Sequence, residues 1–323
     1  MVKKLTNIRN FSKTENIDYS LLLALVKYFD PPVESNMGNH NLYQYDTLKQ
    51  ICLLMEEAKQ KHIRALQAPQ EKDTLVLLCE SLVNEGMRML NAPKKPRQFT
   101  QKVPADELLN DLENFPHAFV IGCLMDRQIK AQLAWKIPYQ LKQRLGSFDF
   151  QTLYSLCHKE PDSIYELVIK PTKLHRYSDT MTKNLISAIK IIADEYEGDA
   201  SKIWSDNPSS EMLVKRFRKF PGIGPKISTM AANILVRDFG IEVSDRSSID
   251  ISVDVHVERV FPRMGFVPAK CSKEDIISKA RELNPEYPGV FDKPIWNCGR
   301  LYCKTTPECV NCGYSELCAK NFE

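Results

Sequence analysis

Two residues in the second half of the chain have side chains that could act together on an electrophilic carbon. Lys226 ends the run Phe-Pro-Gly-Ile-Gly-Pro-Lys, and Asp254 lies in the run Val-Asp-Val-His. A lysine amine can attack such a carbon and hold the product as a Schiff base, provided that burial or a nearby cation lowers its pKa. A carboxylate beside it can accept the lysine proton and stabilise developing positive charge. A lysine that only contacts phosphate and an aspartate that only caps a helix are the alternatives.

The residues before Lys226 predict a helix, a tight turn and a second helix. Gly222 and Gly224 flank Ile223, and glycine adopts positive φ without steric cost, so the backbone can turn sharply there. Pro225 suits the first turn of the following helix, where its missing N–H would have had no partner. A helix that begins directly after such a turn presents free N–H groups and a positive dipole end to an anion.

The charge around this turn points to a phosphate as the anion. The whole chain has a formal charge of +3 and a pI near 8.2, which is only mildly basic. Between residues 212 and 237, however, six side chains are basic and none is acidic: Lys215, Arg216, Arg218, Lys219, Lys226 and Arg237. Such local clustering is typical of a nucleic-acid contact.

These two motifs resemble those of the helix-hairpin-helix DNA glycosylases of the endonuclease III type. The resemblance implies that Lys226 is the nucleophilic lysine, that Asp254 is the essential aspartate, and that the turn at Gly222, Ile223 and Gly224 contacts DNA. It further implies base excision repair of double-stranded DNA that contains a damaged, modified or abasic nucleotide, by a glycosylase with abasic-site (AP) lyase activity. The target nucleotide must flip out of the duplex because its glycosidic bond is unreachable in the stack.

Two other functions remain open at this point. A monofunctional glycosylase for mismatched thymine, uracil or adenine would use water as the nucleophile, although relatives of that kind usually carry another residue at the position of Lys226. A non-catalytic DNA-binding scaffold would grip phosphate and recruit a partner. The polar run at residues 244–248 is interpreted as an inserted loop, because residues 237–252 form a longer connection than the family usually has.

Further DNA contacts follow from the resemblance. Gln128 stands where the family has a glutamine that fills the gap left by the flipped nucleotide, but Asp126 and Arg127 replace the small residues usual before it. His175, Arg176 and Tyr177 occupy the turn that supplies a wedge between bases in the family. Tyr177 is the most suitable of the three for stacking, and a solvated turn is the alternative.

Four closely spaced cysteines predict a metal centre near the C-terminus. Cys303, Cys309, Cys312 and Cys318 resemble the terminal loop that holds the [4Fe-4S] cluster of endonuclease III relatives, with a first interval one residue shorter than usual. Zinc is the competing occupant, but zinc ribbons usually bring two Cys-x-x-Cys pairs, whereas this run contains one. Cys298 is an alternative ligand. The ten cysteines of the chain therefore predict reduced thiols and a metal site rather than disulfides.

The expected fold class is mostly α. We expect an N-terminal helical module of unknown role over residues 1–100, with helices around residues 21–29, 48–58 and 75–87. The resemblance further implies a six-helix barrel with the helix-hairpin-helix over 115–239 and an iron–sulfur cluster domain from 101–114 together with 240–323. The N-terminal module would serve for packing or for a protein partner. The first residues include no apolar run for a signal peptide or membrane helix, so we expect an intracellular protein without membrane contact, cytoplasmic and nucleoid-associated in a prokaryote. We also expect a monomer.

Overall fold

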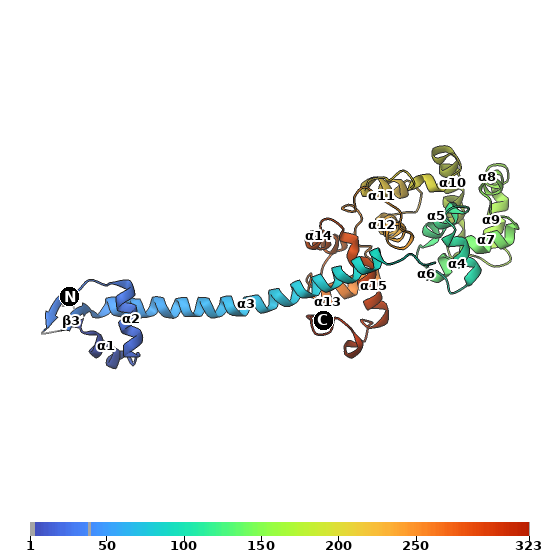
Figure 1. Cartoon of the computed structure of the whole chain (residues 1–323). Helices are drawn as coiled ribbons and strands as arrows, with labels where there is room; N and C mark the ends of the chain where they lie inside the picture. Colours follow the sequence, from blue (N-terminus) through green and yellow to red (C-terminus); the bar gives the residue numbers. More distant parts are fainter. Residues whose placement is uncertain (1–3, 38–39, 323) are drawn as a thin grey trace. The chain divides into compact units, whose positions relative to one another are not determined.

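The computed structural model describes residues 4–37 and 40–322 and confirms the mostly α class (Figure 1). Fifteen α-helices run through these described residues, and strands account for only a few of them. The chain forms two compact units, Met1–Thr74 and Leu75–Glu323. In the described part of the chain, no helix combines the length and the apolar character needed to cross a lipid bilayer.

The first unit contains a small antiparallel sheet that the sequence patterns did not reveal. Its strands are in the order β1-β3-β2, and they are too short to show the two-residue alternation by which strands are recognised. Asn7 and Asp18 accept hydrogen bonds from backbone N–H groups and so begin the two helices of this unit. The elements are β1 (Leu5–Thr6), α1 (Ile8–Glu15), α2 (Tyr19–Phe29), β2 (Ser35–Met37) and β3 (His40–Gln44). A separate small core of Phe11, Leu22, Val26, Tyr43 and Leu48 holds them together.

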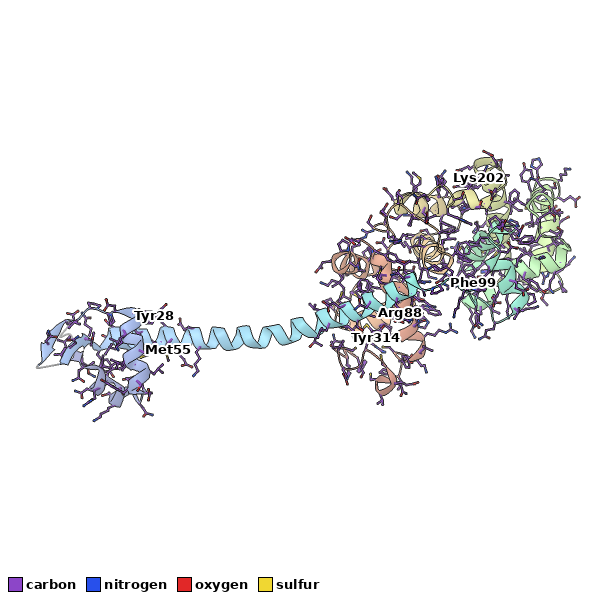
Figure 2. The ribbon with its side chains drawn as sticks, viewed as in Figure 1. Tyr28, Met55, Arg88, Phe99, Lys202 and Tyr314 are labelled. Carbon is purple, nitrogen blue, oxygen red and sulfur yellow. The ribbon has the colours of Figure 1, made fainter. Side chains whose placement is uncertain are left out.

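The helix α3 (Tyr45–Asn91) begins in the first unit, and its last turns belong to the second. The two helices expected around 48–58 and 75–87 are thus parts of one element. Leu78, Leu82 and Leu90 are buried in the main core. A Cβ atom at Gly86 would lie 2.2 Å from the carbonyl oxygen of Val290, so only glycine allows this close approach. Arg88 of α3 and Tyr314 of the C-terminal loop line the same shallow cavity (Figure 2).

The second unit is built around α5, whose ten residues are all buried. A helix that is apolar on every side must be enclosed, and α4, α7, α10 and α12 pack around this one. The first elements of this unit are α4 (Val103–Asn110), α5 (Pro116–Met125), α6 (Ala131–Ala134), α7 (Ile137–Leu145), α8 (Phe150–Lys159), α9 (Pro161–Ile169), α10 (Ser178–Tyr196), η1 (Ala200–Ile203), α11 (Ser210–Arg218), α12 (Pro225–Ile234) and the π-helical turn η2 (Leu235–Phe239).

The rest of the second unit packs α13 against α15. A Cβ atom at Gly299 would lie 2.9 Å from Cβ of His256, so the two helices meet at the closest distance that their side chains allow. The remaining elements are α13 (Val255–Arg263), α14 (Lys273–Leu283), η3 (Pro288–Phe291), α15 (Asp292–Leu301) and η4 (Cys309–Asn311). The domain boundaries expected at residues 100, 114 and 239 stay a prediction.

Candidate active site

The turn between α11 and α12 has the predicted form, but its two glycines differ in backbone conformation and in surroundings. Gly222 has a φ of +94°, and a Cβ atom there would lie 2.5 Å from Nδ2 of Asn184. Gly224 is extended, with a φ of −88°, and caps α12. A Cβ atom at Gly224 would meet no atom within 4 Å, so space is open at the beginning of α12. Ile223 is buried and anchors the turn to the core.

Lys226 is the second residue of α12, and its amine faces a carboxylate that the sequence motifs did not identify. Nζ of Lys226 lies 3.5 Å from Oδ2 of Asp126, at the end of α5. The Asp126 side chain is 9% exposed, whereas that of Lys226 is 40% exposed. The amine is therefore open on one side and held by a nearly buried anion on the other. The signal in the sequence was the acidic residue that directly follows the apolar run at residues 118–125.

Asp254 is the N-cap of α13. Its Oδ1 accepts hydrogen bonds from the backbone N–H groups of His256 at 2.9 Å and Val257 at 3.0 Å. Among the described residues, no donor reaches its Oδ2, so one carboxylate oxygen is available to another group. The hydroxyls of Thr229 and Ser252 lie 3.4 Å apart. This contact joins α12, one turn beyond Lys226, to the chain two residues before Asp254.

The basic residues predicted to contact phosphate divide into paired and exposed ones. Arg216 forms a two-pronged ion pair with Asp206, and Lys219 pairs with Glu195. Arg237 is only 5% exposed and contacts carboxylates. The exposed cations of α11 outside these pairs are Lys215 and Arg218.

Gln128 and Tyr177 are 49 positions apart in the sequence and meet in the structure. The hydroxyl of Tyr177 donates to Oε1 of Gln128 at 2.7 Å. Gln128 has a φ of +54°, which is uncommon for a residue other than glycine and is often found at functional sites. The guanidinium of Arg176 lies 4.9 Å above the Tyr177 ring.

His175 lies beneath this turn and is only 2% exposed. Its ring nitrogens contact the carbonyl of Arg127 at 3.1 Å and the N–H of Tyr177 at 3.0 Å. Burial lowers the pKa of His175, which favours the neutral ring. The ring therefore holds the turn in place, whereas Arg176 and Tyr177 are exposed, and contact of this turn with DNA stays a prediction.

The four predicted cysteine ligands and Cys298 line one small apolar cavity. The Sγ atoms of Cys298 and Cys312 are 3.7 Å apart. Nη1 of Arg263 points at Sγ of Cys303 from 3.6 Å, and the N–H of Lys320 points at Sγ of Cys318 from 3.4 Å. Such N–H groups stabilise thiolate ligands. In the described residues, no three His, Cys, Asp or Glu side chains converge tightly enough to hold a single metal ion.

Comparisons with known proteins can now be set beside this geometry. The model of a family described as HhH-GPD superfamily base excision DNA repair protein matches residues 121–286, which is more than half of the chain. No curated protein matches the chain. A trapped covalent intermediate of endonuclease III with DNA, in an estranged-adenine complex, is 19% identical with a TM-score of 0.45. The match covers 69% of this chain and 97% of that one. A non-covalent endonuclease III–DNA complex is 18% identical over 68% and 94% of the chains, with a TM-score of 0.46.

Proposed function

We propose that this chain, which belongs to the HhH-GPD superfamily of base excision DNA repair proteins, is a DNA glycosylase that uses the Lys226 amine and also cleaves abasic sites. The observation that carries the proposal is the placement of Lys226. Its amine stands at the beginning of a helix, after an open turn, and within 3.5 Å of the carboxylate of Asp126. A carboxylate at this distance can accept the proton that the amine must lose in the reaction.

The reaction requires a nucleophile, a proton acceptor and stabilisation of positive charge. The deprotonated Lys226 amine attacks C1′ of the flipped nucleotide, the bond to the base breaks, and the base leaves with the bonding electron pair. Loss of the ring oxygen from C1′ then yields a Schiff base. Removal of a proton from C2′ breaks the bond between C3′ and the phosphate oxygen, which cuts the strand. Asp126 is placed to take the amine proton, and the free oxygen of Asp254 can face the positive charge that develops on the sugar.

We expect Asp126→Asn to slow formation of the covalent intermediate by about ten- to a hundredfold at neutral pH, because it keeps the side chain's shape and removes the proton acceptor. The rate should then rise with pH over a wider range than in the wild type, since hydroxide must remove the proton instead. Borohydride trapping under single turnover measures both effects. Asp162→Asn, at an exposed acid on α9, is the matched control. An unchanged pH profile would leave Asp126 with no part in proton transfer.

We further propose that Cys303, Cys309, Cys312 and Cys318 hold a 4Fe-4S cluster. A tetrahedral zinc site needs its ligands at about 2.3 Å from one ion, whereas each thiolate of a cubane binds a different iron. The four thiols line one apolar cavity, and this common lining supports the cluster. When bound, the cluster would cross-link the C-terminal loop through its four thiolates. The Sγ atoms of Cys298 and Cys312 are in contact, so Cys298 is the candidate to replace one of the four ligands.

Anaerobically purified protein should be brown, absorb at roughly 400 nm and contain about four iron and four sulfide ions per chain. Cys303→Ser should lower the iron content and the unfolding temperature. Cys298→Ser should keep the iron and the absorbance, which tests the choice between these two cysteines. Colourless protein that contains zinc would contradict the assignment.

The experiment that tests the function is borohydride trapping on a duplex with a single abasic site. A covalent adduct, with strand cleavage in the absence of borohydride, is expected. Tight binding without an adduct, but with release of a base from damaged duplex, would favour the monofunctional glycosylase. Tight binding with neither reaction would favour the scaffold.

A further inference from the structure

Residues 249–253 lead directly into Asp254 and form neither helix nor strand. The side chains of Ile249, Ile251 and Val253 are buried in the main core, so alternate residues anchor this segment. Buried backbone groups outside regular structure need hydrogen-bond partners from elsewhere in the chain. In residues 249–253, which we call the lead segment, such partners come from several other elements.

Two helices near the end of the chain hold the lead segment on one side. The N–H of Ser252 donates to Oδ1 of Asp292, the first residue of α15, at 3.0 Å. The carboxylate of Asp250 accepts two hydrogen bonds from Arg281 of α14, at 2.7 and 2.8 Å. These contacts restrain the lead segment close to the beginning of α13, where Asp254 lies.

Asn233 of α12 holds the lead segment from another side, and its side chain is fully buried. Its Nδ2 donates to the carbonyl of Asp250 at 2.9 Å, and its Oδ1 accepts from the hydroxyl of Tyr287 at 2.9 Å. A carbonyl can only accept a hydrogen bond, so the nitrogen of the amide must face Asp250. A Cβ atom at Gly289 would lie 2.3 Å from Oδ1 of Asn233, so the amide is closely enclosed there.

The same helix carries Lys226. Thr229 and Asn233 follow Lys226 by three and seven positions, and this spacing places all three residues on one face of a helix. The hydroxyl of Thr229 lies 3.4 Å from that of Ser252 in the lead segment. Thus α12 has the amine at its beginning and, one and two turns later, the two side chains that contact the segment before Asp254.

We infer that Asn233, assisted by Thr229, is a positioning residue that sets where the Asp254 carboxylate lies relative to the Lys226 amine. The inference rests on the proposed function, because it concerns the same two groups. A displacement of about 1 Å between reacting groups can cost about a hundredfold in rate. An asparagine that only completed the core would instead affect the stability of the protein and leave the rate of the folded protein unchanged.

Asn233→Leu removes the amide and keeps a side chain of similar size. It should slow adduct formation on an abasic duplex by about ten- to a hundredfold under single turnover. The affinity for this duplex, measured by fluorescence anisotropy, should change by less than about twofold. Asn110→Leu is the matched control, because the Asn110 side chain likewise ties a loop to a helix, through both backbone groups of Arg97. The control should lower the unfolding temperature without slowing the adduct.

A double-mutant cycle with Asp254→Asn separates positioning from a general structural role. Once the charge of Asp254 is gone, its exact place matters little, so Asn233→Leu should slow the reaction by less than about threefold in that background. An equal loss in both backgrounds would overturn the inference, and so would an equal loss in Asn110→Leu. The absence of an adduct with the wild type would instead contradict the proposed lyase function.

Hydrogen–deuterium exchange of the free protein tests the inference without any chemistry. Peptides that cover residues 249–257 should exchange at least about tenfold faster in Asn233→Leu than in the wild type, and Asn110→Leu should leave them unchanged. Unchanged protection of these peptides would overturn the inference, whether or not the protein is a lyase. The failure of the inference and the failure of the proposed function are therefore distinguishable.

Thr229 provides a second measurement in case Asn233→Leu does not fold. Thr229→Val keeps the shape of the side chain and removes the hydroxyl, so it should slow adduct formation by about three- to tenfold. Thr229→Ser retains the hydroxyl and should recover most of this loss. If the valine and serine variants react at the same rate, the contact with Ser252 has no part in placing Asp254, and the inference is wrong.

Discussion

Replacing Lys226 with glutamine should abolish the borohydride-trapped adduct on abasic DNA, with a loss of about a thousandfold or more in the rate of strand cleavage. No other group in the proposed site is an amine, and an amide nitrogen cannot form a Schiff base. The fold should survive, because the Lys226 side chain is 40% exposed and the glutamine amide can still donate a hydrogen bond to the Asp126 carboxylate. Single-turnover trapping followed by denaturing electrophoresis measures the effect.

Lys215→Gln is the matched control for this prediction. Lys215 is an exposed cation on α11, the helix that precedes the same turn. The Lys215→Gln variant should bind the duplex more weakly and with a smaller salt dependence, while the bound protein still forms the adduct. An adduct that persists in Lys226→Gln would show that a different amine is the nucleophile. The loss of DNA binding together with the adduct would reduce Lys226 to a phosphate contact.

The second large effect is expected for Asp254→Asn, which should slow base release and strand cleavage by about a hundred- to ten-thousandfold. Asparagine is as good an N-cap as aspartate, and its amide oxygen can accept the same bonds from His256 and Val257. The substitution therefore removes the negative charge while α13 keeps its first turn. The unfolding temperature of Asp254→Asn should be almost the same as that of the wild type. Stopped assays of product formation under single turnover give the rate.

Asp254→Ala separates capping from catalysis. It removes both the cap and the charge, so it should lower stability by about 1 kcal/mol relative to Asp254→Asn. The two variants should nevertheless share the same loss of activity. If Asp254→Asn were as active as the wild type and only Asp254→Ala were impaired, the aspartate would serve as a helix cap alone.

Local features of the candidate site could be predicted from the sequence because they depend on short-range backbone preferences. A proline after a glycine turn begins α12, and an aspartate at the N-cap begins α13. Both starts can be predicted because the first N–H groups of a helix have no hydrogen-bond partner within the helix. The different requirements at Gly222 and Gly224 were not predictable, since the positive φ of Gly222 and its contact with Asn184 arise only in the folded chain.

The sequence by itself determined the mostly α class, the helix-hairpin-helix and the run of cysteines, since each depends on the types and spacing of nearby residues. The tertiary structure alone decided which distant groups meet. Asp126 is 100 positions from Lys226, and Gln128 is 49 positions from Tyr177. Such encounters follow from how helices pack around α5, and packing depends on the shapes of many side chains at once, which no short pattern in the sequence records.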